Sequence, residues 1–259
     1  MNSTETKKWY YILPVISIAI LLGGWMLLAQ GENSMIPTPY ATLKRFLDIC
    51  VNPISKAILP VHMWVSLRRV LIAFAFAIVL GIGLGVGLGW SVTFHAFVDP
   101  VFEIIRPIPP IAWIPLVILW CGIGELPKVV IVFIGSFVPI VLNTYSGIKE
   151  IDPLLINAGL VLGANRRQLL TEITLPATTP AILAGIRTAL SSGWMCVVAA
   201  EMIAAKQGVG FLIVRGQESG DTALIVACML VIGVVSLLLS TILSKLEGVL
   251  CPWQFSKTK

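Results

Sequence analysis

The chain has 259 residues, of which 57% are hydrophobic and 12% are charged, and its mean hydropathy is +0.94. Soluble domains carry about a quarter charged residues, so this composition excludes a soluble enzyme and a disordered linker and predicts a protein embedded in a bilayer. The formal net charge of +5 fits basic flanks around membrane spans, and we infer no nucleic-acid partner from it. The five cysteines are scattered and the two histidines are isolated, so we predict no disulfide framework and no metal site.

Charged residues are rare enough for the gaps between them to mark membrane spans. A helix needs about 20 uncharged residues to cross the hydrocarbon layer, and the first such stretch is too long for a cleaved signal peptide. One further span is predicted over a stretch rich in small residues that contains Arg187 and Glu201. The six predicted helices cover approximately residues 9–29, 64–90, 108–123, 128–148, 178–203 and 222–245. This pattern predicts an all-α polytopic membrane protein.

The segments between the spans carry the remaining charge. Residues 31–63 hold four prolines and a short amphipathic piece over 40–50, which predicts a loop with an interfacial helix. Residues 149–177 form the longest charged stretch in the second half of the chain. With the N-terminus inside, ten of the 18 Lys and Arg residues fall on the cytoplasmic side. The positive-inside rule therefore favours, by a small margin, cytoplasmic N- and C-termini.

The second span contains glycine at every other position from Gly81 to Gly89. This spacing produces three overlapping G-x-x-x-G pairs, and small residues four apart allow two helix backbones to approach closely in lipid. We therefore predict a helix-packing face, the alternative being that glycine is simply common in membrane helices. No G-x-G-x-x-G sequence is present, so the stretch does not indicate a nucleotide-binding loop.

The third predicted span begins with the sequence RPIPP at 106–110 and continues through Trp113 and Pro115. Each proline removes a helix donor, and such backbone survives at membrane depth only against protein or a water-filled cavity. Pro115 therefore indicates a translocation pathway, while residues 107–110 fit a pathway or a proline-rich loop equally well. Glu201 is either a gate or ion-pair partner, because ionisable residues inside a span are costly, or a residue at headgroup level. For Arg187 we expect contact with lipid phosphate.

Several reaction classes are excluded by missing motifs. The chain has no Gly-Lys pair and hence no G-x-x-x-x-G-K-[ST] sequence, so it cannot split ATP through a phosphate-binding loop of its own. An intramembrane enzyme would need a paired nucleophile and base, which the sequence does not offer. We therefore expect a transport subunit without a cofactor of its own. A stand-alone secondary carrier is the alternative from a different class, although no inverted repeat is visible.

Residues 157–176 predict two short helices joined by a sharp turn. The first begins after Asp152 and Pro153 and breaks at Gly163, where a left-handed turn costs little. The second extends from about Arg166 to Glu172, and Pro176 opens the next span. Small residues at 157–159 leave room for another protein to contact the first helix.

This segment resembles the coupling loop of ABC importer permeases, which has the pattern E-A-A-x3-G-x9-I-x-L-P. The spacing matches throughout, but Asn157 stands in place of Glu and Gly159 in place of the second Ala. The resemblance implies contact with an ATPase through Asn157, Ala158, Gly159, Gly163, Ala164, Arg166, Arg167, Ile173, Leu175 and Pro176. It also implies a type I ABC importer permease fold, with a cytoplasmic coupling loop at 149–177.

Four further segments, 106–116, 119–125, 142–148 and 200–205, are similar to the branch of these permeases that imports nitrate, bicarbonate, taurine and alkanesulfonates. The likeness covers about residues 36–253. It implies import of a small oxyanion by alternating access, or alternatively of a neutral or aromatic compound such as a vitamin precursor. It also implies an N-terminal span with an external loop (1–63), a permease core (64–253) and a cytoplasmic tail (254–259).

The resemblance further implies the partners and the functional residues. The partners are a second copy of the chain, two ATPase subunits that bind ATP and Mg, an extracytoplasmic solute-binding protein and the bacterial cytoplasmic membrane. The predicted pathway residues are Arg106, Pro109, Pro110, Trp113, Pro115, Asn143, Trp194 and Glu201. The predicted contacts with the binding protein are Glu125, Lys128, Lys206, Arg215 and Glu218.

Overall fold

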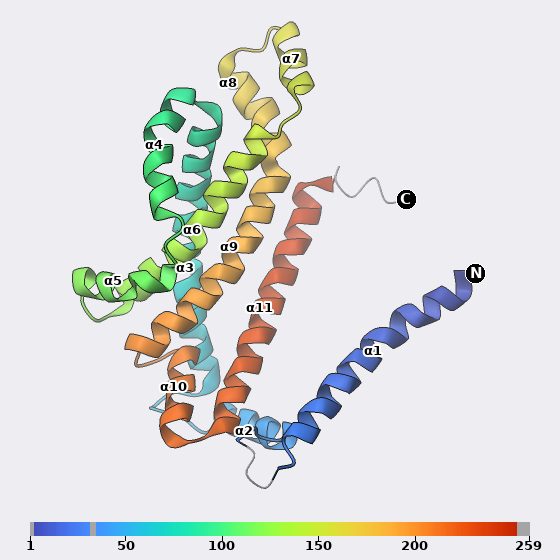
Figure 1. The fold of residues 1–259 in the computed structure, drawn as a ribbon, viewed down its shortest axis with the longest axis vertical. Coiled ribbons are helices and arrows are strands. Elements are labelled where there is room, and N and C mark those ends of the chain that lie inside the picture. Colours follow the sequence, from blue (N-terminus) through green and yellow to red (C-terminus); the bar gives the residue numbers. More distant parts are fainter. Residues whose placement is uncertain (1–2, 32–34, 253–259) are drawn as a thin grey trace.

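The computed structural model describes residues 3–31 and 35–252, and all named elements within these ranges are helices (Figure 1). The all-α fold is therefore as predicted, whereas the predicted tail at 254–259 lies outside the described residues. The elements are α1 (Ser3–Leu28), α2 (Pro39–Val51), α3 (Leu59–Trp90), α4 (Val92–Ile105), η1 (Pro110–Trp113), α5 (Ile114–Cys121), α6 (Glu125–Lys149), α7 (Pro153–Val161), α8 (Arg166–Gln168), η2 (Leu169–Thr174), α9 (Leu175–Ala204), α10 (Val209–Ser219) and α11 (Thr222–Leu250).

Within the described residues, four helical stretches are long and apolar enough to cross a membrane: α3, α6, the continuous stretch Arg166–Ile203 that includes α9, and α11. A fifth arises if α4 and Pro110–Cys121, which meet at a bend of 85°, count as one span. The described apolar part of α1, Leu13–Leu28, is shorter. The predicted count of six spans is therefore not confirmed in full.

The predicted span over 108–123 is confirmed only in part. Residues Pro110–Cys121 are helical, as the 3-10 helix η1 followed directly by α5, but this stretch is too short to be a span by itself and is separated from α4 by a break. The cause is the run of prolines, because Pro107, Pro109 and Pro110 each lack the backbone donor that would continue the helix from α4.

Helix α6 packs between α3 and α9 and brings both close to its own backbone. Every second glycine of α3, at every fourth residue, faces α6, and these pairs are Gly81 with Ile140, Gly85 with Thr144 and Gly89 with Ile148. A Cβ atom on Gly85 would lie 2.6 Å from the Cβ of Thr144, whereas no described atom lies within 4 Å of such an atom on Gly83. The predicted packing face is confirmed, and it is formed by the G-x-x-x-G pairs of Gly81, Gly85 and Gly89.

The contact of α6 with α9 also depends on small residues. Gly135 of α6 faces Cys196, and Gly193 of α9 faces Ser136. Further along α9, Arg187 is paired with Glu247 of α11. The sequence did not predict this ion pair. The Arg187 side chain is still 43% exposed, so its contact with lipid phosphate stays a prediction.

The two ends of the bundle differ in character (Figure 1). Helices α7 and α8 extend from one end, and α2 and α10 lie at the other. A helix is present as α2 where the sequence predicts one over 40–50, and Arg45 Nε donates to Asp221 Oδ2 at 2.7 Å, which ties α2 to the start of α11. Helix α1 runs away from the bundle on the side of α2 (Figure 1).

Candidate functional site

The loop between α6 and α9 has the two-helix geometry that the sequence predicts. Asp152 Oδ1 accepts a hydrogen bond from the Leu154 amide at 2.8 Å and caps α7. The chain reverses at Gly163, which has a φ of +83°. Asn165 and Gln168 then exchange side-chain to backbone hydrogen bonds of 2.9 Å in both directions, which forms a capping box at the start of α8.

Gly159 fixes how closely α7 approaches η2. It is buried, and a Cβ atom at this position would lie 2.8 Å from Leu169 Cδ2 and collide with Ile173 Cδ1. Its carbonyl accepts a hydrogen bond from the Ala164 amide at 3.0 Å, across the turn. An alanine at this position would therefore require the terminal methyl groups of Ile173 and Leu169 to move.

The tip of this loop presents apolar side chains to its surroundings. Val161 and Leu162 are 87% and 86% exposed, and Asn157, Ala158, Arg166 and Arg167 are exposed nearby. Ile173 is half-buried against Gly159, and Leu175 and Pro176 open α9. An apolar tip with a basic flank, projecting from the bundle (Figure 1), is a surface suited to contact with another protein.

Four of the predicted pathway residues line one cavity of about 320 Å³. It lies between the segment that joins α4 to η1 and the middle parts of α6 and α9. Among its lining residues Arg106 alone is charged, and its guanidinium is 2.9 Å from Glu103. Trp113 Nε1 is buried and has no hydrogen-bond partner in the described part of the chain. The predicted residues on this cavity are Arg106, Pro109, Pro110 and Trp113, and they meet Pro139, Ser192, Met195 and Cys196 there.

The other predicted pathway residues lie elsewhere. Pro115 is exposed on α5, and Asn143 donates to the Pro139 carbonyl at 2.8 Å while packing against Gly185. Trp194 is buried in the hydrophobic core, with 4% of its surface exposed. The structure therefore does not bring these three side chains to the cavity.

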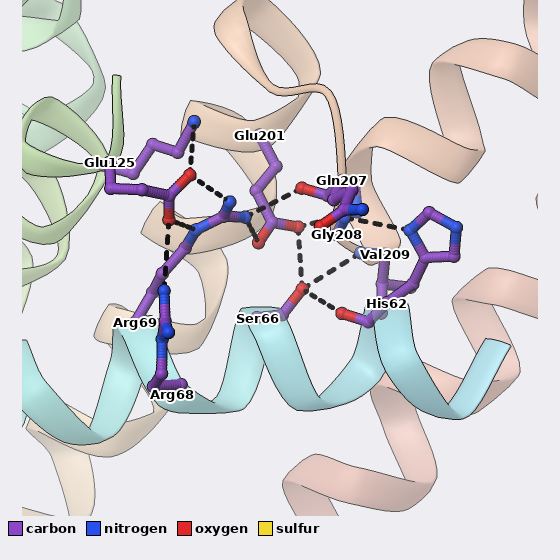
Figure 2. A network of polar contacts seen from close by, with 11 residues as sticks. His62, Ser66, Arg68, Arg69, Glu125, Glu201, Gln207, Gly208 and Val209 are labelled. Atoms are coloured by element: carbon purple, nitrogen blue, oxygen red, sulfur yellow. Dashed lines mark hydrogen bonds and ion pairs between the residues drawn. The ribbon is translucent and has the colours of Figure 1, made fainter. Parts of the chain in front are cut away.

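Glu201 belongs to a buried polar network at the opposite end from the α7–α8 loop (Figure 2). Only 1% of its surface is exposed. Its Oε1 accepts from Arg69 Nη1 at 2.6 Å, and its Oε2 accepts from Ser66 Oγ and from the Gly210 amide, both at 2.9 Å. Glu201 is thus an ion-pair partner, which is one of the roles that the sequence suggested for it.

Arg69 is the centre of this network and is only 2% exposed. Its Nε and Nη2 donate to the two carboxylate oxygens of Glu125 at 2.7 and 2.6 Å, and its Nη1 also donates to the Gln207 carbonyl at 2.9 Å. Nearby, His62 Nδ1 accepts from the Gly208 amide at 3.1 Å (Figure 2). The network therefore joins α3, the start of α6, the end of α9 and the connection to α10.

Sequence reasoning missed Arg69, Ser66 and His62. Arg69 lies within the predicted span 64–90 and receives no role from the sequence, in which both histidines are isolated. A usable signal was present, since Arg69 and Glu201 are opposite charges that the predicted topology places near the same membrane surface. Because an unpaired charge within a membrane span is costly, two opposite charges on neighbouring helices are expected to form an ion pair.

The residues predicted to contact a binding protein divide into two groups. Lys206 is exposed, and Arg215 and Glu218 form an exposed pair at 2.8 Å on α10. Lys128, in contrast, is 5% exposed and donates to Glu125 at 3.2 Å. The expectation for Lys128 is therefore corrected, because a buried ammonium cannot meet a partner protein in this conformation. No group of three or more potential metal ligands is found among the described residues.

The sequence model of one family, described as "Binding-protein-dependent transport system inner membrane component", matches residues 77–253. The chain belongs to this family. The taurine transport system permease protein TauC of Escherichia coli is 35% identical over 93% of this chain and 89% of its own length. The nitrate import permease protein NrtB of Synechocystis is 32% identical over 93% of this chain and 90% of its own. The putative aliphatic sulfonates transport permease protein SsuC of Bacillus subtilis is 30% identical over 95% and 87%.

A solved structure carries the same fold. The inward-facing MetNI methionine ABC transporter has a chain that matches 74% of this one, with 95% of its own length covered, a TM-score of 0.65 and 20% identity. The predicted type I ABC importer permease fold is therefore confirmed. Membership of a binding-protein-dependent transport family makes this chain a membrane transport subunit and removes the stand-alone secondary carrier from consideration.

Proposed function

We propose that this chain is the membrane-spanning subunit of an ATP-driven importer for a small oxyanion of the taurine, alkanesulfonate, nitrate or bicarbonate type. The observation that carries the proposal is the likeness, over more than nine-tenths of the chain, to permeases named for taurine, nitrate and aliphatic sulfonates. The single cation on the mid-bundle cavity, Arg106, supports the choice of an anion.

The complete importer would contain two copies of this chain, two ATPase subunits that bind ATP and Mg, and an extracytoplasmic solute-binding protein. The α7–α8 loop and both termini would face the cytoplasm of a bacterium. The exposed apolar tip at Val161 and Leu162 supports an ATPase contact there, and the exposed side chains of Lys206, Arg215 and Glu218 support contact with the binding protein at the other end.

The continuity of helix supports a path for mechanical coupling. Arg166–Ile203 is one helical stretch, so a force applied to α8 is transmitted along α9. That stretch carries Ser192 and Cys196 on the cavity wall and ends beside Glu201. Movement of the ATPases would therefore reach the cavity through α9 and alternate its access to the two sides.

Uptake assays test the nature of the solute. With the reconstituted importer we expect ATP-dependent uptake of taurine or nitrate, and we expect Arg106→Gln to reduce it because the cavity loses its cation. Lys245→Gln, which removes an exposed cation of α11 that does not line the cavity, serves as the control. The other cavity contacts are mostly apolar and include Trp113 and Met195, which favours the second candidate, a neutral or aromatic solute. Uptake of such a compound, unaffected by Arg106→Gln, would replace the oxyanion by this alternative.

Substitutions at Gly163 test the coupling loop. A β-branched side chain at a φ of +83° is strained by about 1–2 kcal/mol or more, whereas asparagine tolerates the left-handed region. We therefore expect Gly163→Val to separate ATP hydrolysis from uptake while the importer still assembles, and Gly163→Asn to retain uptake. Equal uptake by the Val and Asn variants would contradict the coupling role.

A further inference from the structure

Three cationic side chains converge on the single carboxylate of Glu125 (Figure 2). Arg69 binds it with two parallel hydrogen bonds of 2.7 and 2.6 Å, and Lys128 Nζ donates to it at 3.2 Å. Arg68 Nη2 lies 4.0 Å from the same group. A planar carboxylate held by the edge of a guanidinium is the geometry with which proteins bind oxyanions.

Burial is distributed unevenly across this cluster. The side chains of Arg69 and Lys128 are 2% and 6% exposed, whereas that of Glu125 is 52% exposed. Two buried cations therefore depend on an anion that is itself open to the surroundings. A buried cation without a counter-ion is strongly unfavourable, so this position must hold an anion of some kind.

Glu201 cannot supply that anion. It is fully buried and already accepts from Arg69 Nη1, Ser66 and Gly210. Glu201 therefore neutralises the Nη1 side of the Arg69 guanidinium. The Nε–Nη2 edge of Arg69 and the ammonium of Lys128 depend on Glu125 for their counter-charge. With Glu125 withdrawn, Arg68, Arg69 and Lys128 would face Glu201 alone, and the cluster would carry two unbalanced positive charges.

The position of Glu125 allows it to withdraw. It is the first residue of α6 and follows Gly122 and Gly124. No described atom lies within 4 Å of a Cβ placed on either glycine. The Glu125 side chain is itself 52% exposed, so turning it outward would break its contacts with the three cations but would give up little burial.

We propose that Arg69, Lys128 and Arg68 form an entry site for a small oxyanion, and that Glu125 occupies this site until the solute displaces it. The proposal rests on the proposed function for placing this end outside the cytoplasm and for the nature of the solute. The site would receive an oxyanion released near α10, before it reaches the mid-bundle cavity. Glu125 then acts as a tethered competitor that keeps the two buried cations neutralised when no solute is present.

Anion binding to the full chain in lipid nanodiscs, without ATPase or binding protein, tests this proposal. The readout is the thermal unfolding midpoint during titration with nitrate or formate against chloride at constant ionic strength. We expect Glu125→Gln to lower the midpoint, and nitrate or formate to raise it again by stabilising the folded state. Its apparent Kd for these anions should be about tenfold or more below that of the unaltered chain, since the tethered competitor is gone.

The controls separate a binding site from a merely structural ion pair. Glu150→Gln removes an exposed glutamate at the other end of α6 and should respond to the anions as the unaltered chain does. Glu125→Gln combined with Lys128→Met should lose the response. A nitrate or formate response of Glu125→Gln no larger than that of Glu150→Gln would overturn the proposal.

Where Glu125→Gln does not accumulate, Glu125→Asp replaces it, because its shorter side chain reaches the cations less well. An intermediate response of this variant supports the entry site, and a response equal to that of the unaltered chain overturns it. The assay needs neither ATP nor transport. Anion binding without ATP-dependent uptake would therefore contradict the proposed function but support the entry site. ATP-dependent uptake without anion binding would support the proposed function but contradict the entry site.

Discussion

Arg69 shows what a buried charge requires in a membrane protein. Each of its donating nitrogens has an acceptor, from Glu125, Glu201 or the Gln207 carbonyl. Four separate chain segments supply the groups of this network, so a single side chain holds one end of the bundle together. Its neighbour Arg68 is 55% exposed and 4.0 Å from Glu125, which provides a natural comparison.

We expect Arg69→Met to destabilise the folded chain by about 3–5 kcal/mol, because it leaves Glu201 buried without a counter-charge. Arg68→Met should change the stability by about 1 kcal/mol or less, as is usual for an exposed pair. Thermal unfolding of both variants in nanodiscs measures the difference. Equal midpoints for the two variants would show that the network does not stabilise the fold.

The site could be predicted only in part because its partners are far apart in the sequence. Glu201 stands out as a carboxylate within an apolar stretch, so composition alone identifies it. Arg69 stands at the end of such a stretch and is 132 residues from Glu201. Which charges meet depends on how the helices are arranged around α6, and that information is not present in any single segment.

At the scale of elements, α6 is the helix around which the others are organised. It meets glycines of α3 on one side and small residues of α9 on the other. Because lipid offers no strong apolar driving force between helices, close backbone contact supplies much of their association. The folded bundle therefore depends for its stability on the close backbone contacts of α6 with α3 and α9.

The two glycines Gly85 and Gly83 allow this requirement to be measured. Gly85→Leu should cost about 1–3 kcal/mol or more, because the side chain would meet Thr144 and the Val141 carbonyl. Gly83→Leu adds the same side chain where no described atom lies within 4 Å and should be tolerated. Chemical or thermal unfolding in detergent tests the pair, and a larger loss for Gly83→Leu would contradict the assignment of the packing face.

Elements that depend on local chemistry were predicted well. The α7–α8 loop follows from Asp152, Gly163 and Asn165, each of which acts within a few residues of its own position. The third span was predicted poorly, since the prolines at 107–110 show where a helix must stop but not in which direction the chain continues. The bend of 85° is set by packing against α6 and α9.

For the whole molecule, the position of the two ends relative to the membrane is the main prediction. We expect a cysteine at Leu162 to react with an impermeant maleimide only after the cell membrane is opened, and one at Lys206 to react in intact spheroplasts. The background should carry Cys121→Ser, since Cys121 is exposed. The opposite labelling pattern would reverse the proposed orientation.

The wide separation of Arg69 and Glu201 also has a consequence for biogenesis. At about 5–20 residues per second, synthesis of the 132 residues between them takes roughly 7–26 s. During that interval α3 is already available for insertion while one partner of its arginine does not yet exist. The guanidinium, near the start of α3, must be held at the lipid–water boundary until α9 arrives, so insertion of α3 is complete only when the ribosome has made most of the chain.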